Sequence, residues 1–249
     1  MNTPGRTVAF LFALSIATSA SAADIKVLCS NGLRAVIEDL VPKFETVTGN
    51  RVVLQYEPST QLQKRIDAGE AFDLAILTTT LIDEEIKAGR LTADSRTVLA
   101  HSGLGLSIRS GAKKPDISTV NKFKSALLNA ESITYATQGA SAQPFEVLVA
   151  KLGITSQIKP KYNLRNTASE VGEAVSTGVV ELGVAPVSEI LPVRGVDLVG
   201  PFPKEIQSYV EMTGAVSAGA KSGDAAKALV AFITAPSNMV VIKAKGMER

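Results

Sequence analysis

The sequence predicts an α/β protein with a mostly parallel sheet, divided into two lobes that face each other across a ligand cleft. Three observations lead to this expectation. Segments with strand character alternate with segments of helical periodicity from Ile25 onward, which is typical of parallel sheets covered by helices. One pattern, an apolar run followed by a small polar loop and an amphipathic helix, occurs three times between residues 25 and 89. Two long extended regions, Val98–Ile108 and Tyr209–Ala218, are suited to be crossover strands between the lobes.

The three repeated units place hydroxyl and amide side chains where a strand ends and a helix begins. The apolar runs are Ile25–Leu28, Val52–Leu54 and Leu74–Leu77, and the polar positions after them are Ser30, Asn31, Gly32, Ser59, Thr60 and Thr78. A helix N-terminus carries unpaired N–H groups and the positive end of the helix dipole, so it favours an anion. Several such termini at one sheet edge predict an anion pocket. The alternative is that these side chains only cap their helices.

The elements of the first half follow from periodicity and from glycine stops. Apolar residues at helical spacing predict a helix over Leu33–Thr48 that ends at Gly49, with Pro42 as a kink or a break. The next elements are expected to be strand Arg51–Tyr56, helix Gln61–Ala68, strand Asp73–Leu77 and helix Leu81–Ala88. A glycine follows each of these helices, as expected at a helix C-terminus.

The second half continues the same alternation. The expected elements are helix Val120–Leu128 capped by Ser118, strand Ser132–Ala136, helix Gln143–Leu152, strand Lys159–Leu164, helix Ser169–Thr177, strand Glu181–Ala185, a loop-rich region Val193–Gln207, strand Ser208–Ala218, and helices Asp224–Ile233 and Asn238–Ala244. The crossovers then assign residues 24–100 and 207–249 to lobe one and residues 101–206 to lobe two. Ligands of open α/β sheets bind at the carboxyl ends of the strands, so the cleft is the expected site.

Residues 1–23 have the features of a cleavable secretory signal. Arg6 is followed by the apolar run Val8–Ala17 and by the small residues Ala20-Ser21-Ala22. We expect cleavage after Ala22 or Ala23, export to the periplasm and no stable insertion in the membrane.

Composition argues against several classes of protein. Without Arg6, 25 basic and 24 acidic residues remain, a net charge of +1, which argues against nucleic-acid binding. One cysteine leaves no internal disulfide. The sequence shows no P-loop, no nucleophile elbow and no cluster with metal-ligand spacing, so neither a cofactor nor a metal site is expected. A catalytic pair of Cys29 and His101, the single residues of their types, is an unfavoured alternative.

The segments Ser59–Leu62, Arg65–Gly69 and Asp73–Leu77, in that order, resemble the periplasmic molybdate-binding proteins of ABC transporters, within the type II solute-binding proteins. The similarity continues through Leu182–Ala185 and Ile242–Gly246, so it covers the mature chain in order and spacing. The resemblance implies two α/β lobes joined by a hinge, and a tetrahedral oxyanion held by neutral donors.

The resemblance also implies particular ligand positions. Ser59 is the serine expected at the second helix start, and Ser141 is the small residue that donates a backbone N–H. Gly32 stands where a serine is usual and Pro186 where a tyrosine is frequent, so two expected hydroxyls are replaced. Together with the polar loops, the predicted ligand-binding residues are Ser30, Asn31, Gly32, Ser59, Thr60, Thr78, Ser141, Thr167, Ala168 and Pro186.

The predicted function is therefore that of a non-catalytic, monomeric, exported solute-binding protein. It is expected to capture a molybdate-like oxyanion through neutral hydroxyl and backbone N–H donors and to deliver it to an ABC permease. A small organic anion, such as a carboxylate or a phosphonate, is an alternative within the same fold, because Gly32 and Pro186 enlarge the pocket if their side chains line it. Alternatives from other classes are a secreted hydrolase and a ligand sensor for a membrane kinase.

Overall fold

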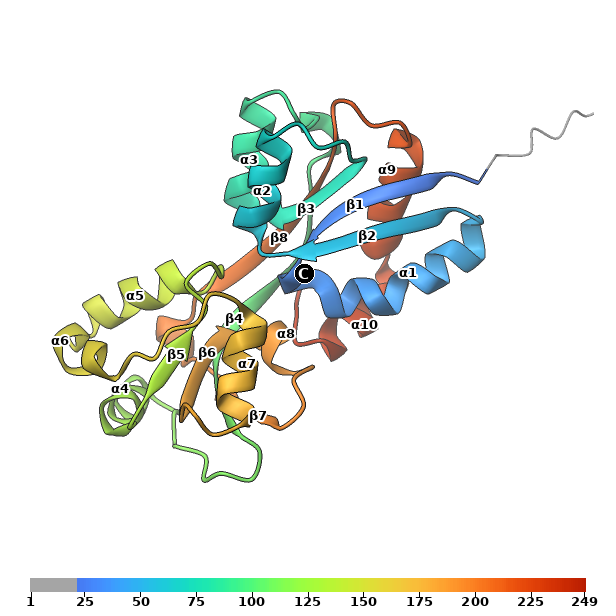
Figure 1. Ribbon diagram of the computed structural model, residues 1–249. Coiled ribbons are helices and arrows are strands. Elements are labelled where there is room, and N and C mark those ends of the chain that lie inside the picture. Colours follow the sequence, from blue (N-terminus) through green and yellow to red (C-terminus); the bar gives the residue numbers. More distant parts are fainter. Residues whose placement is uncertain (1–21) are drawn as a thin grey trace, which may run out of the picture.

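A computed structural model describes residues 22–249. The predicted signal segment lies almost wholly outside these residues. The strands form one continuous mixed sheet in the order β2-β1-β3-β8-β4-β6-β5, and β7 also pairs with β4. The strands are β1 (Asp24–Ser30), β2 (Arg51–Glu57), β3 (Leu74–Thr78), β4 (Thr97–Arg109), β5 (Ile133–Tyr135), β6 (Leu182–Pro186), β7 (Val196–Pro201) and β8 (Tyr209–Val216). Figure 1 shows the two lobes that this sheet connects.

Strand β4 belongs to both halves of the sheet. Its residues 97–103 pair antiparallel with β8, while residues 104–109 pair with β6 and β7. Strands β1, β2 and β3 run parallel to one another, and β3 pairs antiparallel with β8. The chain thus passes from the first lobe to the second along one unbroken strand, β4. The chain returns through residues 202–208, just before β8, and the predicted lobe boundaries at residues 100 and 207 remain a prediction.

The first lobe is a sheet covered by helices on both faces. The long helix α1 (Arg34–Thr48) buries its apolar stripe with α9 (Gly223–Ile233) and α10 (Met239–Ala244) in the larger core. Helices α2 (Ser59–Asp67) and α3 (Thr79–Lys87) lie on the opposite face over a smaller core. Helix α1 contains Pro42 and ends at Gly49, whose φ of 73° is left-handed, as predicted for a glycine stop.

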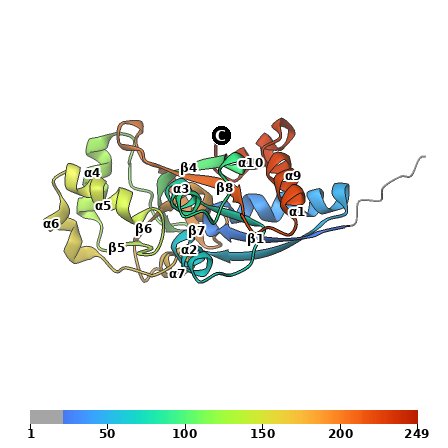
Figure 2. The ribbon, with the colours of Figure 1, turned by 90° about the horizontal axis from the view of Figure 1, so that it is seen from above.

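The second lobe carries the remaining helices around β4, β5, β6 and β7. They are α4 (Val120–Asn129), α5 (Ala142–Lys151), α6 (Thr155–Ile158), α7 (Ala168–Ser176) and α8 (Val187–Ile190). Seen from above, α4, α5 and α6 lie at one end of the molecule, while α1 and α9 lie at the other (Figure 2). Phe145 of α5 is fully buried, and its ring packs against Tyr135, Tyr162 and Phe202.

Three local expectations are wrong. Residues 159–161 form a 3-10 turn (Lys159–Lys161) rather than the start of a strand, since Pro160 cannot donate to a ladder. The region expected to be loop-rich, Val193–Gln207, also contains β7, a strand that the sequence did not predict and that adds an edge to β4. The cap of α4 is Thr119, which accepts from the Lys122 N–H, and not Ser118.

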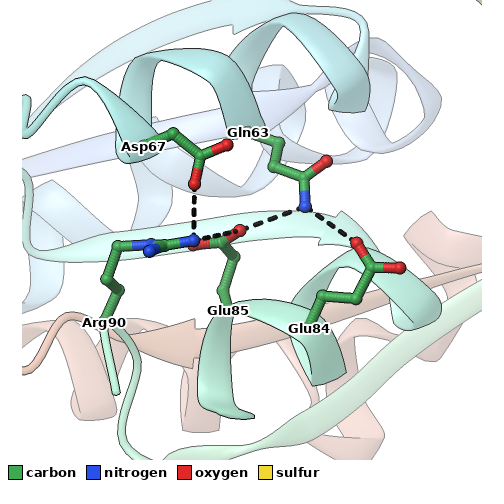
Figure 3. A network of polar contacts seen from close by, with 5 residues as sticks. All are labelled: Gln63, Asp67, Glu84, Glu85 and Arg90. Atoms are coloured by element: carbon green, nitrogen blue, oxygen red, sulfur yellow. Dashed lines mark hydrogen bonds and ion pairs between the residues drawn. The ribbon is translucent and has the colours of Figure 1, made fainter. Parts of the chain in front are cut away.

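A buried acidic residue connects the two helices on the outer face of lobe one. The Glu85 side chain has no exposed surface, and its carboxylate accepts from Arg90 Nε at 2.5 Å and from Gln63 Nε2 at 3.1 Å (Figure 3). Arg90 also bonds to Asp67 and Gln63 also bonds to Glu84. Because Gln63 and Asp67 lie on α2 and Glu85 lies on α3, the network fixes the two helices relative to each other.

The described residues contain no single helix of the length and apolar character needed to cross a bilayer. Helix α9 and the segment Pro236–Ala244 reach that length only together, and they are bent by 56°.

Candidate functional site

A small cavity lies between the two lobes, at the carboxyl ends of β1 and β3. Its volume is about 70 Å³. It is lined by Ser30, Asn31, Pro58, Ser59, Thr60, Thr78, Leu81, Gln138, Gly139, Ala140, Thr167, Ala168 and Glu189. The first-lobe residues belong to the three repeated strand-to-helix units of the sequence. The fold therefore brings three loops that are distant in sequence to one point, as the topology of parallel strands requires.

The first-lobe wall consists of helix starts without side-chain caps. The 3-10 turn Asn31–Leu33 that leads into α1, and helices α2 and α3, have no side-chain cap hydrogen bond. The hydroxyl of Ser59 accepts the Thr78 N–H at 3.2 Å, so its own proton remains available to a ligand. Polar groups at these termini are therefore not used up by capping, and the alternative that Ser30, Ser59 and Thr60 act only as caps gains no support.

The second-lobe wall comes from the loop before α5 and from the start of α7. Gln138, Gly139 and Ala140 lie in that loop, and Thr167 and Ala168 begin α7. Helix α7 is capped by its own residues, because Thr167 accepts from the Glu170 N–H and the Glu170 carboxylate accepts from the Thr167 N–H. This capping box fixes the direction of α7, whose N-terminus faces the cavity.

Two side-chain hydrogen bonds connect the lobes beside the cavity. Gln61 Nε2 of α2 donates to Gln138 Oε1 at 2.8 Å. Ser188 Oγ of α8 donates to the carbonyl of Gly32 at 3.1 Å, and both residues are buried. The structure therefore shows the two lobes in contact across the cleft.

Glu189 is the one acidic or basic residue that lines this cavity. Burial raises the pKa of its carboxyl group to about 7, with no second cause. It also borders an adjoining cavity of about 340 Å³, whose lining includes Arg34 and Glu38. The guanidinium of Arg34 is paired with Glu38 at 2.7 Å, so it gives Glu189 no counter-charge.

Seven of the ten predicted ligand residues line the cavity: Ser30, Asn31, Ser59, Thr60, Thr78, Thr167 and Ala168. Their role as ligand contacts remains a prediction. Gly32, Ser141 and Pro186 do not line it. All three are buried: Gly32 lies in the turn before α1, Ser141 precedes α5, and Pro186 ends β6. Because neither Gly32 nor Pro186 lines this cavity, the replacement of a larger residue at these two positions does not enlarge it.

A side chain at position 32 would first meet the end of the Met212 side chain. A Cβ atom added there would lie 2.5 Å from Met212 Cε and 3.7 Å from Glu189 Oε1. The serine implied by the resemblance would therefore displace Met212 before it reached a bound anion.

Other chemistry finds little support in the described part of the chain. No group of three or more His, Cys, Asp and Glu side chains there is placed to hold a metal ion. Cys29 is buried, and burial raises the pKa of its thiol, which disfavours a nucleophilic thiolate. His101 packs edge-on against Tyr209 and lines a separate hollow of about 900 Å³ formed with the C-terminal segment. The Cys29–His101 pair is thus not a catalytic arrangement.

Comparisons with known proteins agree on the family and the fold. A model of the family described as bacterial extracellular solute-binding protein matches residues 25–248. The chain is 27% identical over 229 residues to an aconitate isomerase of Pseudomonas sp., covering 90% of this chain and 87% of that protein. It is also 27% identical over 247 residues to the molybdate-binding protein ModA of Azotobacter vinelandii, covering 97% and 96% of the two chains.

The fold is also that of a solved structure. The periplasmic molybdate-binding protein of Azotobacter vinelandii matches with a TM-score of 0.76 at 16% identity, over 90% of this chain and 99% of that chain. This likeness confirms the predicted two-lobed α/β fold. Since the family match extends over nearly all described residues, the chain belongs to the family of bacterial extracellular solute-binding proteins.

Proposed function

We propose that this protein captures a small oxyanion of the molybdate type in the interlobe cavity and delivers it to an ABC permease from the periplasm. The observation that carries the proposal is the convergence of uncapped helix N-termini on one small cavity. Backbone N–H groups and hydroxyls there can donate several hydrogen bonds to an anion without a full positive charge. Such a site selects among anions by their size and shape.

The size of the cavity supports a compact ligand. A cavity needs about 10–15 Å³ to hold one water molecule. The cavity of about 70 Å³ therefore has room for a tetrahedral oxyanion in contact with the lining residues. The relative ModA, named as a molybdate-binding protein, supports the same ligand class. The protein is proposed to act without a cofactor and as a monomer, with the permease as its partner.

Ser59→Ala tests the binding site. Loss of one donor to a charged ligand is expected to weaken molybdate or sulfate binding by about 1–3 kcal/mol, roughly 5- to 150-fold. Calorimetry of both variants measures this, and Ser125→Ala on the exposed face of α4 serves as the control. If Ser59→Ala binds with the affinity of the original protein, the hydroxyl only orders the Thr78 N–H. If the unsubstituted protein binds carboxylates or phosphonates but no inorganic oxyanion, the organic-anion alternative is right.

A second candidate function is isomerisation of a small unsaturated polycarboxylate, and Glu189 is the observation that favours it. A carboxyl group with a pKa of about 7 inside an anion cavity suits a general base. The relative named as an aconitate isomerase supports this class. In such a step Glu189 takes a proton from the methylene carbon next to the double bond, and the electron pair moves into the allylic and carboxylate system. The carboxyl proton exchanges with solvent, and Glu189 then delivers one proton to the far carbon. One C–H bond breaks and one forms, so no oxidant is needed.

Proton NMR with cis-aconitate in heavy water tests the second candidate. Appearance of the trans isomer with deuterium on carbon is expected, and Glu189→Gln is expected to lower the rate by about 10²-fold or more. A carboxylate that binds but gains neither isomer nor deuterium would leave the protein a binding protein only.

A further inference from the structure

Glu189 occupies a position that a site made only of neutral donors does not need. Its side chain lines the small anion cavity and the adjoining cavity, at the wall that they share with Asn31 and Ala168. Among the described residues, no hydrogen bond or ion pair holds its carboxyl group. An anion in the small cavity would therefore meet this carboxyl group directly.

The backbone around Glu189 is fixed. The preceding residue, Ser188, is buried, and its N–H donates to Ser102 Oγ at 3.1 Å. Its hydroxyl donates to the Gly32 carbonyl across the lobes at 3.1 Å. These two bonds attach the start of α8 to β4 and to the first lobe, so the backbone that carries Glu189 is held beside the cavity.

Charged groups on the surrounding elements do not neutralise Glu189. Helix α8 packs against β4, β6, β7 and the turn before α1. The ionisable residues of these strands are His101 and Arg109 on β4 and Asp197 on β7, while β6 and the turn have none. On α1, Arg34 and Glu38 pair with each other, and on α7 the carboxylate of Glu170 caps its own helix. Burial is the cause that raises the pKa of the Glu189 carboxyl group.

We propose that Glu189 determines specificity by requiring one proton to be shared between its carboxyl group and the bound anion. This inference rests on the proposed function. An anion without a proton, such as molybdate or sulfate, is bound only by the protein with protonated Glu189, whose O–H donates to the anion. An acid anion that keeps an O–H, such as hydrogen phosphate or a hydrogen phosphonate, donates that O–H to ionised Glu189 and is still bound when Glu189 has lost its proton.

The direction of the pH dependence follows from the two protonation states. The pKa of Glu189 is about 7 in the empty protein, and a bound dianion raises it further by repulsion. Binding of molybdate is therefore at full strength below pH 7. Above pH 7 its dissociation constant is expected to rise about tenfold per pH unit, because each unit removes nine-tenths of the competent form.

Calorimetry with molybdate between pH 6 and 9 tests the proposal. We expect the dissociation constant to increase by about 50-fold from pH 7 to 9, because half of the carboxyl groups are already ionised at pH 7. Titrations at pH 8 in buffers of different ionisation enthalpy are expected to show uptake of about one proton. Glu189→Gln, whose amide cannot ionise, is expected to flatten the profile. Glu173→Gln, on the exposed face of α7, is the matched control and should keep it.

The outcomes separate this inference from the proposed function. Molybdate binding that is independent of pH and takes up no proton would overturn the role of Glu189 and leave oxyanion capture intact. Failure of molybdate, sulfate and phosphate to bind at pH 6 would overturn both. The proton count uses only the unsubstituted protein, so it decides the question even if Glu189→Gln does not fold.

Discussion

Replacing Asp73 by alanine is expected to lower the free energy of unfolding by about 3 kcal/mol or more. It removes the acceptor of three partly buried N–H groups, and each such group costs about 1–3 kcal/mol without one. Asp73 is 4% exposed and precedes β3. Its Oδ2 accepts the Lys26 N–H at 2.9 Å, and its Oδ1 accepts the N–H groups of Lys221 and Ser222 at 2.8 and 2.9 Å. One carboxylate thus joins β1, β3 and the loop before α9.

Denaturant unfolding of the variant measures the loss. Asp94→Ala is the control, because the side chain of Asp94 is 70% exposed and pairs with Lys227 at the surface. If both variants lost the same small amount of stability, the three N–H groups at Asp73 would be hydrogen-bonded to water in the variant. The carboxylate would then contribute little to the stability of lobe one.

Phe145→Ala is expected to cost about 3–5 kcal/mol, because it leaves a cavity in a core that cannot close around it. The Phe145 ring is fully buried at the centre of the aromatic group of lobe two, next to Tyr135 and Phe202. Helix α5, which carries it, follows the loop that supplies Gln138 to the anion cavity. The substitution is therefore also expected to weaken anion binding through the loosened loop.

Val147→Ala on the same helix is the control, since Val147 is 41% exposed. Thermal unfolding of the two variants, followed by circular dichroism, compares them. A loss below about 1 kcal/mol for Phe145→Ala would mean that the neighbouring rings repack into the vacated space.

The sequence was most informative where local signals and tertiary needs agree. The three units from β1 to α3 carry apolar runs, polar loops and glycine stops, and each local signal points to the same element. Strand β7 was not predicted because its residues lie between Gly195 and Pro201, in a stretch dominated by turn signals, and only pairing with β4 makes them a strand. Residues 159–164 alternate polar and less polar side chains, as a strand can, but Pro160 removes the donor that a strand there would need.

The cavity residues also fall into those that the sequence could predict and those that it could not. Ser59 and Thr78 could be predicted because they follow apolar strands at helix starts. Gln138 and Glu189 could not, because each stands in a segment without strong periodicity, and their place at the cavity is set by how the second lobe packs on the first. Pro186 was assigned from the resemblance alone, and Gly32 from the first loop and the resemblance together. Their places outside the cavity lining depend on packing beside Met212 and on the end of β6.

Gly103 of β4 pairs with Tyr209 of β8, so the segment between them, which contains β5, β6, β7 and the helices around them, begins and ends at two adjacent backbone positions. The intervening segment is thus an insertion with neighbouring ends, which can be exchanged as one module between relatives through two junctions. Gln138, Thr167 and Glu189 would travel together in such a graft, while Ser59 and Thr78 would stay with the host. Ligand preference in this architecture is consequently a combination of two separable halves, and a new preference can arise from recombination as readily as from point substitution.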